Sequence, residues 1–331
     1  MSTSVDDASA WIASDVEDSD EWTWTWTADE LDELQAAVEA VADRDVTTLK
    51  RVDFALPTIA DKLVEVKRYL DEGRGFALLN GLPLHERFTE EQATKVYWAV
   101  GAHLGELLVA QNANGDHLGQ ITDLGFAGEN RRRYATNEGG AFHSDPTDYV
   151  GLLCIHPAMY GGDSMVVSST AVYNVILREH PEYAPLLYRP FPIDLRNEDM
   201  AGTSRWRPQP MFSYVDGHLS SVPHFGWAIS AMRFTDVPRL TADELSALYF
   251  LESVAKRPEM ILHMRMAAGD IQLVNNYTIL HTRTTYIDDP DEPARRRRLV
   301  RLWMSNPSTG RVLCPEYHAL RDGFGNAIAV A

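Results

Sequence analysis

The chain has 331 residues, of which 45% are hydrophobic, and its formal net charge is -18. This length allows a sizeable core, built as one large domain or two modest ones. The acidic balance excludes nucleic acid and anionic membranes as main partners, because both call for a basic surface on the protein.

The N-terminal segment is the most acidic part of the chain. Residues 1–45 contain fourteen Asp and Glu residues and a single base, Arg44. Residues 1–20 are predicted to form a poorly ordered acidic arm, since they have little apolar surface to bury. Residues 21–331 are predicted to form a single domain. The three tryptophans Trp22, Trp24 and Trp26 alternate with threonines, which indicates a short strand or an extended arm.

Helical patterns dominate the next part of the chain. Thr27 and Glu30 form a capping-box signature that opens a helix. Two further helical patterns cover Asp61–Asp71 and Thr89–Leu104, and a short apolar strand covers Gly75–Leu79. We therefore predict a helical shell over residues 28–104.

From about residue 105 the chain changes to short apolar runs separated by Gly, Asp, Asn and Pro. The clearest strand candidates are Val150–Ile155, Ser164–Ser168, Phe212–Tyr214, Met260–Met266, Ile271–Leu273 and Leu299–Met304. Helical patterns interrupt them at Ala171–Glu179 and Ala242–Ala255. The predicted class is mixed α/β with a mainly β core, as a double-stranded β-helix (jelly-roll, cupin-like) with flanking helices. Its core would take up about residues 75–80 and 105–305, and an insertion at about 190–255 would cover the site.

No stretch approaches the roughly 20 apolar residues of a membrane span. The acidic N-terminus, with Asp6, Asp7 and Glu17, is unlike a signal peptide, which begins with basic and then apolar residues. Cys154 and Cys314 are the only cysteines and have no metal-binding spacing, so we expect reduced thiols in a cytoplasmic protein.

The motif His143-Ser144-Asp145 is the first candidate for chemistry. On an extended segment, residues two apart point the same way, which suits two ligands to one metal. His281 follows the apolar stretch Ile271–Leu280, as a third ligand at the rim of a sheet would. Two imidazoles and one carboxylate are the protein's share of the facial triad that holds non-haem Fe(II). The alternative is a His–Asp hydrogen bond in a loop. Among the other histidines, His218 and His224 stay ambiguous, because both fall in the insertion.

Four consecutive arginines, Arg295–Arg298, follow the last of these histidines, and Arg301 comes shortly after. Strand alternation puts Arg297 and Arg301 on one face and Arg298 on the other. A guanidinium binds a carboxylate in a bidentate geometry, so these arginines are candidates for an anionic ligand.

These motifs carry a family resemblance. The ordered set is Phe142-His143-Ser144-Asp145, Gly161-Gly162-Asp163-Ser164, Gly269-Asp270 through Asn275-Asn276 to His281, and Arg297 to Arg301. Over roughly residues 75–305 the chain resembles the taurine dioxygenase family of Fe(II)/2-oxoglutarate-dependent oxygenases, which includes clavaminate synthase-like enzymes.

The resemblance implies Fe(II) as cofactor, held by His143, Asp145 and His281, with 2-oxoglutarate and O2 as co-substrates. Arg297 would bind the distal carboxylate of 2-oxoglutarate, with Arg298 as the competing register. Ser164 stands where the family usually has a threonine on that carboxylate. Arg301 would hold either 2-oxoglutarate or an anionic group of the substrate.

The implied enzyme hydroxylates or desaturates an unactivated C–H bond and releases succinate and CO2. Its substrate would be small and anionic or amino-acid-derived, such as a natural-product intermediate. Two other classes stay open from the sequence. One is a cupin-like metal-dependent hydrolase or isomerase, and the other is a non-catalytic binding protein on the same fold.

Overall fold

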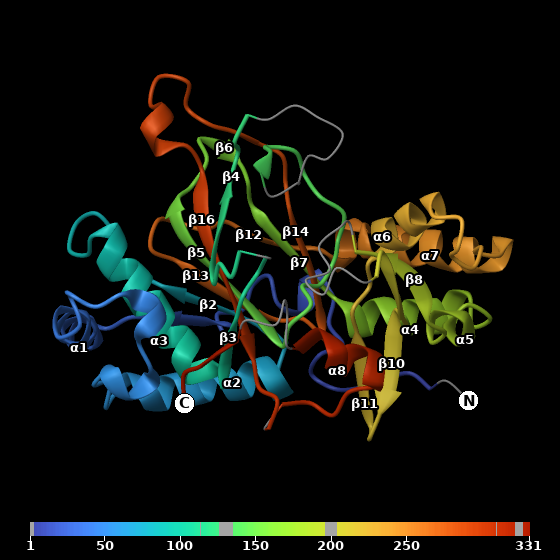
Figure 1. Cartoon of the computed structure of the whole chain (residues 1–331), viewed down its shortest axis with the longest axis horizontal. Coiled ribbons are helices and arrows are strands. Elements are labelled where there is room, and N and C mark those ends of the chain that lie inside the picture. The colour runs from blue at the N-terminus through green and yellow to red at the C-terminus, as the bar shows by residue number, and fades with distance from the viewer. Residues whose placement is uncertain (1–2, 113, 126–134, 196–203, 309, 322–326) are drawn as a thin grey trace.

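The computed structural model of the protein describes residues 3–112, 114–125, 135–195, 204–308, 310–321 and 327–331. Helices lie on both sides of a central group of strands (Figure 1). The predicted mixed α/β class with a largely β core is therefore confirmed. Within the described residues, no helix combines the length and the apolar character that crossing a membrane requires.

The larger sheet has the strand order β1-β2-β13-β5-β16-β3-β17, with β4 also paired to β16. Its pairs are antiparallel except for β1 with β2. The bounds of its strands are β1 Thr23–Thr25, β2 Phe76–Asn80, β3 Leu107–Val109, β4 Leu118–Thr122, β5 Tyr149–His156, β13 Ile271–Asn275, β16 Arg298–Ser305 and β17 Ala327–Ala329.

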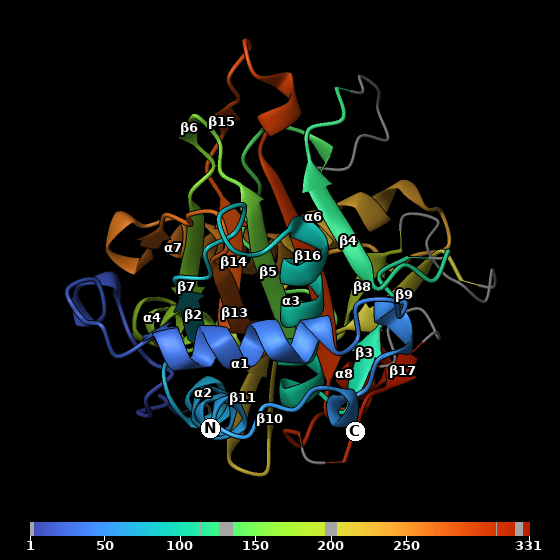
Figure 2. The ribbon, with the colours of Figure 1, turned by 90° about the vertical axis from the view of Figure 1, so that its left-hand side faces the viewer.

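Three helices cover the outer face of this sheet, as Figure 2 shows. They are α1 Ala28–Glu39, α2 Ile59–Glu72 and α3 Glu90–Leu104. Their apolar faces join alternate residues of β16, namely Val300, Leu302 and Met304, in one core cluster. Even-numbered residues of β16 thus face the helices, and odd-numbered residues face the interior.

A smaller antiparallel sheet faces the interior from the other side, with the order β12-β7-β14. Its strands are β12 Leu262–Met264, β7 Ser164–Ser168 and β14 Ile279–Arg283. Val166 and Ile279 of this sheet share a buried cluster with Val150, Val274 and Trp303 of the larger one. The interior between the two sheets is therefore apolar at this level, and it is the space into which the odd-numbered residues of β16 point.

A second helical layer and the predicted insertion lie beyond the smaller sheet (Figure 1). Val167 and Leu280 of that sheet are buried in the same cluster as residues of α4, α5 and α7. The elements here are α4 Ser169–Glu179, α5 Ala184–Leu187, β8 Phe191–Asp194, β9 Trp206–Gln209, β10 Phe212–Val215, β11 His218–Ser221, α6 Phe225–Ser230 and α7 Ala242–Ala255. Among the described residues, the other short strands and the last α-helix are β6 Tyr160–Gly161, β15 Tyr286–Ile287 and α8 Pro315–Arg321.

Residues 3–20 differ from the poorly ordered arm that their composition predicts. Trp11 is buried against Phe76 of β2, with ring centroids 5.1 Å apart, and its indole N–H donates to the Arg74 carbonyl. Val16 is also fully buried. A few apolar side chains are enough to dock this segment, because the sheet already offers a surface for them to cover.

The capping box at Thr27 offers a direct test of a sequence signal. The Thr27 hydroxyl accepts from the Glu30 N–H, and the Glu30 carboxylate accepts from the Thr27 N–H at 2.8 Å. Thr27→Ala should therefore lower the free energy of unfolding by about 1 kcal/mol in urea titrations. Thr58 is the matched control, since it caps α2 without a side-chain hydrogen bond. Thr58→Ala should cost less than about 0.5 kcal/mol, and an equal loss in both variants would contradict the assignment.

Candidate metal centre

His143, Asp145 and His281 meet in the interior between the two sheets. His143 forms an isolated antiparallel bridge with His281 of β14, and their backbones exchange hydrogen bonds of 3.2 and 2.8 Å. This pairing brings the two imidazole centroids to 4.6 Å. Asp145 lies two residues further along the same segment. One donor atom from each of the three side chains lies within 4.8 Å of the other two.

The separations suit one divalent ion. His143 Nε2 lies 4.0 Å from Asp145 Oδ1, and His281 Nε2 lies 3.9 Å from Asp145 Oδ2. Ligands bound to one ion at about 2.1 Å lie roughly 3 to 4 Å apart. His143 Nδ1 lies 3.0 Å from the Ala141 carbonyl, which fixes the ring with Nε2 toward Asp145. The donor set and its orientation therefore fit a metal of the non-haem iron type.

Several groups hold the Asp145 carboxylate in its charged form. Trp303 Nε1 donates to Oδ2 at 2.8 Å, and Arg301 Nη1 donates to both oxygens at 3.3 Å. Burial acts to raise the pKa of Asp145, but the Arg301 charge, followed by His281 and His143, outweighs burial and holds this pKa at about 2. Burial lowers the pKa of His281 to about 3, helped by repulsion from His143. At neutral pH the site thus offers a carboxylate and a neutral His281, the forms that bind a metal.

Arg301 comes from the interior face of β16 and is fixed by contacts beyond Asp145. Its Nε donates to Gln111 Oε1 at 2.7 Å, and the Gln111 amide donates to the Arg301 carbonyl at 2.7 Å. These contacts use Nε and Nη1 of the guanidinium. The structure therefore places Arg301 beside the triad, as an immediate neighbour of the carboxylate.

Arg297 also points into the interior, and it is buried. Its Nη2 donates to the Gly162 carbonyl at 3.0 Å, and its guanidinium lies over the Tyr286 ring at 5.1 Å. Nη1 is buried without a hydrogen-bond partner among the described residues. Gly162 has a φ of +74°, and a Cβ there would lie 2.6 Å from Arg297 Nε. Gly162 of the Gly-Gly-Asp-Ser motif therefore leaves room for the Arg297 side chain, whose Nη1 has an unused hydrogen-bond donor.

Arg298 has a different environment. It lies on the helix side of β16, where Nη2 forms an ion pair with Glu90 at the start of α3. This ion pair holds Arg298, the alternative candidate for the 2-oxoglutarate carboxylate, on the outer side of the sheet. The alternation of the strand predicts opposite faces for the two arginines, and the structure shows which of them is interior.

Ser164 lies at the start of β7, two residues after Gly162. Its hydroxyl donates to Gln272 Oε1 of β13 at 2.8 Å, and both residues are buried. An external carboxylate could receive this proton only if the hydroxyl turns away from Gln272. The sequence prediction singled out Ser164 but not Gln272, because a glutamine in an apolar strand carries no motif.

The insertion contributes a second group of residues around the triad. His224 is buried and stacks on Trp227, with centroids 4.4 Å apart and planes 9° apart. His224 Nε2 has no hydrogen-bond partner among the described residues. Burial, together with the charges of Arg207 and His143, lowers the pKa of His224 to about 3. The electrostatic effect of Arg207 and of the triad on His224 indicates that this part of the insertion lies near the site. The insertion residues 196–203 lie outside the described residues.

Trp303, Gln111 and Asn276 are site residues that the sequence did not indicate. Asn276 Oδ1 accepts from the Asp145 N–H at 2.9 Å and so fixes the backbone of the metal motif. Asn276 belongs to the Asn275-Asn276 pair of the family motif, which is the one signal that could have revealed its role. Trp303 and Gln111 are isolated in the sequence, and only the folded sheet brings them to the site.

Comparison with known proteins identifies the family of this chain. The model of the family described as "Taurine catabolism dioxygenase TauD, TfdA family" matches residues 36–303. FR-33289 synthase of Streptomyces rubellomurinus is 33% identical over 312 residues, covering 92% of this chain and 90% of that protein. Taurine hydroxylase-like protein SAT17 of Stachybotrys chartarum is 24% identical over 315 residues, covering 90% and 80%.

Solved structures share the fold at low sequence identity. Asparagine oxygenase, in complex with Fe(II), 2S,3S-3-hydroxyasparagine and succinate, superposes with a TM-score of 0.67 at 15% identity, covering 90% of this chain and 98% of that one. The non-heme iron oxygenase OrfP, in complex with Fe and alpha-ketoglutaric acid, gives a TM-score of 0.64 at 15% identity, covering 86% and 93%. With the family model matching most of its length, the chain belongs to the TauD/TfdA family of dioxygenases.

Proposed function

We propose that His143, Asp145 and His281 bind Fe(II), and that the protein uses 2-oxoglutarate and O2 to hydroxylate or desaturate a C–H bond of a small anionic or amino-acid-derived substrate. The observation that carries this proposal is the group of two imidazoles and one charged carboxylate within 4.8 Å in the interior. When bound, the iron and 2-oxoglutarate supply the oxidising chemistry, with succinate and CO2 as co-products. The chain supplies binding, orientation and charge.

Each residue around the triad has a separate part in this proposal. Asp145 stays ionised because Arg301 and Trp303 donate to it, so it keeps its ligand form at neutral pH. Arg297 binds the distal carboxylate of 2-oxoglutarate through the buried Nη1 that otherwise lacks a partner. Ser164 adds its hydroxyl to the same carboxylate.

The substrate side is formed by the insertion. The charge of Arg207 acts on His224, and among the described residues the Arg207 side chain forms no ion pair with a carboxylate. Its Nε donates to Gln209 at 3.2 Å, which leaves both Nη groups for an anion. The stacked pair His224 and Trp227 provides a flat wall beside it. Together with Nη2 of Arg301, these residues favour a substrate that has an anionic group and an apolar or planar part.

Three further features belong to the proposal. The two facing sheets are interpreted as a double-stranded β-helix of the jelly-roll, cupin-like kind. Residues 21–331 form one domain, with the insertion at about 190–255 over the site. A cytoplasmic location stays a prediction.

A succinate-release assay tests the function. Purified protein with Fe(II) and 2-oxoglutarate should be screened against amino acids, sulfonates, phosphate esters and phosphonates. The panel should include asparagine, arginine, taurine and uridine-5'-phosphate, because proteins similar to this chain are named for these compounds or are bound to their products. Substrate-dependent succinate that requires Fe(II) supports the proposal. Turnover with Zn(II) in the absence of O2 and 2-oxoglutarate would instead support a metal hydrolase or isomerase.

The Trp303 indole gives a graded test of the metal site. Trp303→Phe removes the 2.8 Å hydrogen bond to Asp145 while keeping an aromatic ring in the interior. Loss of such an outer contact to a ligand lowers metal affinity about 10- to 100-fold. We therefore expect a rise of this size in the Fe(II) concentration that gives half-maximal activity. Trp227→Phe is the control, since its ring stacks on His224 and contacts no proposed ligand. An unchanged Fe(II) requirement in Trp303→Phe would contradict the assigned role.

A further inference from the structure

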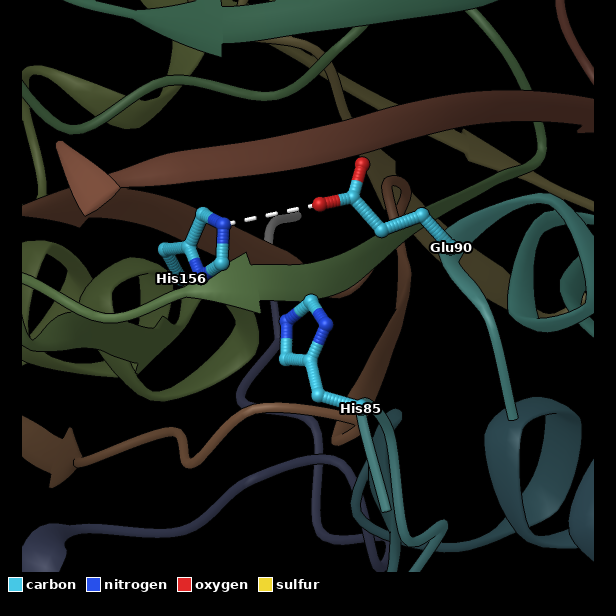
Figure 3. Close-up of side chains that lie close together, drawn as sticks. All are labelled: His85, Glu90 and His156. Atoms are coloured by element: carbon cyan, nitrogen blue, oxygen red, sulfur yellow. Dashed lines mark ion pairs between the residues drawn. The ribbon is translucent and has the colours of Figure 1, made fainter. Parts of the chain in front are cut away.

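A second group of metal-ligating side chains lies on the outer side of the larger sheet. His85 comes from the loop between β2 and α3, Glu90 is the first residue of α3, and His156 ends β5. One donor atom from each lies within 4.8 Å of the other two. Figure 3 shows the three side chains converging, with His156 Nε2 3.5 Å from Glu90 Oε1. From this geometry we infer a second metal site, for a borderline divalent ion such as Zn(II).

Hydrogen bonds from neighbouring groups orient the three side chains, as they commonly do for the ligands of a metal ion. Arg298 donates to Glu90 Oε2, which leaves Oε1 on the side of His156. The His85 Nε2 atom lies 3.4 Å from the Ile155 carbonyl, so Nδ1 is the nitrogen left for a ligand. A hydrogen-bonded carboxylate and a histidine anchored on a backbone carbonyl are the usual supports of a metal site.

The backbone at His85 provides an independent observation. His85 has a φ of +71°, in the left-handed region that residues with a Cβ seldom occupy. Such a strained backbone conformation persists only where surrounding contacts stabilise it, and strained residues concentrate at functional sites. Here it brings the ring of His85 parallel to that of His156, with centroids 4.9 Å apart and planes 11° apart.

The charges around the three side chains have both signs. Glu90 supplies the one carboxylate of the group, and Arg298 donates to its Oε2 atom. The positive charge of Arg298 opposes metal binding, and it limits the affinity without blocking Oε1.

The site is separate from the triad and open to water. Arg298 points outward next to Arg297, which points inward, so the two groups lie on opposite faces of one sheet. His85 is exposed, which leaves a path for an ion to enter. A bound ion would join the β2–α3 loop, the start of α3 and the end of β5. We expect it to raise the thermal stability of this part of the fold and to take no part in the oxidation.

Zn(II) titration by calorimetry tests the site in two backgrounds. The wild type should bind two equivalents, and His85→Ala should bind one. In the full-length double variant His143→Ala/His281→Ala, which lacks the inner site, one equivalent should remain. Adding His85→Ala or Glu90→Gln to that background should weaken the remaining binding by at least about tenfold. His263→Ala is the matched control, since His263 is an exposed histidine on β12 and belongs to neither group.

A second measurement separates binding at this site from adventitious binding to surface histidines. Zn(II) should shift the imidazole ¹⁵N resonances of His85 and His156 and leave those of His263 in place. It should also raise the melting temperature of the double variant, but not after His85→Ala is added. Zn(II) affinity that is the same with and without His85 would overturn the inference, and so would unshifted resonances of His85 and His156. Neither readout depends on oxygenase activity, so this test can fail while the proposed function stands.

Discussion

His143→Ala should abolish succinate release from 2-oxoglutarate, with a fall in kcat of at least about 10³-fold. Loss of an outer contact costs metal sites about 10- to 100-fold, and loss of a ligand itself should cost more. His143 is the better of the two histidines to replace, since its side chain is 40% exposed against 10% for His281. Removing it should therefore disturb the interior less.

The measurement is Fe(II)-dependent succinate release, with iron content determined on the same samples. His263→Ala, on the exposed face of β12, is the control and should keep wild-type activity. Comparable melting temperatures for the two variants would show that the fold survives. Activity above a tenth of wild type in His143→Ala would refute its role as a ligand. Full retention of iron with loss of activity would point instead to a role in binding the substrate.

Part of the triad could be predicted because its information is local. His143 and Asp145 are two residues apart on an extended segment, and His281 follows a continuous apolar stretch. Period-2 alternation alone then brings two of the side chains to one face. The bridge between His143 and His281 depends on the fold, and the sequence indicates only that His281 is a candidate third ligand.

The residues that hydrogen-bond to the triad and to Arg301 could not be predicted in the same way. Trp303 and Gln111 reach Asp145 and Arg301 only because β16 lies in the larger sheet with its odd-numbered residues turned inward. An aromatic or amide residue within an apolar run has no signature before the sheet forms. The outer group was missed for a related reason. Nothing in the sequence links His156 to His85 and Glu90.

The orientation of Arg297 and Arg298 could be predicted only in part. Alternation predicts that Arg297 and Arg298 face opposite ways, but it cannot say which face is interior. That depends on α1–α3 covering the side of Val300, Leu302 and Met304. Once those apolar residues face the helices, Arg298 must face outward with them, where it forms an ion pair with Glu90. The proposed partner of 2-oxoglutarate is therefore selected by packing on the opposite side of the sheet.

Arg297→Gln should lower kcat/KM for 2-oxoglutarate by about 10³-fold, mainly through KM. Hydrogen bonds to charged groups contribute about 1.5 to 3 kcal/mol each, and the unpartnered Nη1 has two N–H groups to donate. Arg297 is 4% exposed, so bulk water has little access to replace the lost donors. Arg297→Lys should fall between Gln and wild type, because lysine keeps the charge but cannot form the planar fork.

Steady-state kinetics with 2-oxoglutarate varied at saturating Fe(II) and substrate measures this effect. Arg296→Gln, a neighbouring exposed arginine, is the control and should leave KM within about threefold of wild type. Arg298→Gln tests the other register directly. If Arg298→Gln raised KM for 2-oxoglutarate and Arg297→Gln did not, the register would be wrong by one residue. A fall in kcat alone in Arg297→Gln would assign this arginine to the substrate or to the fold, because a co-substrate contact made equally in the ground and transition states acts on KM.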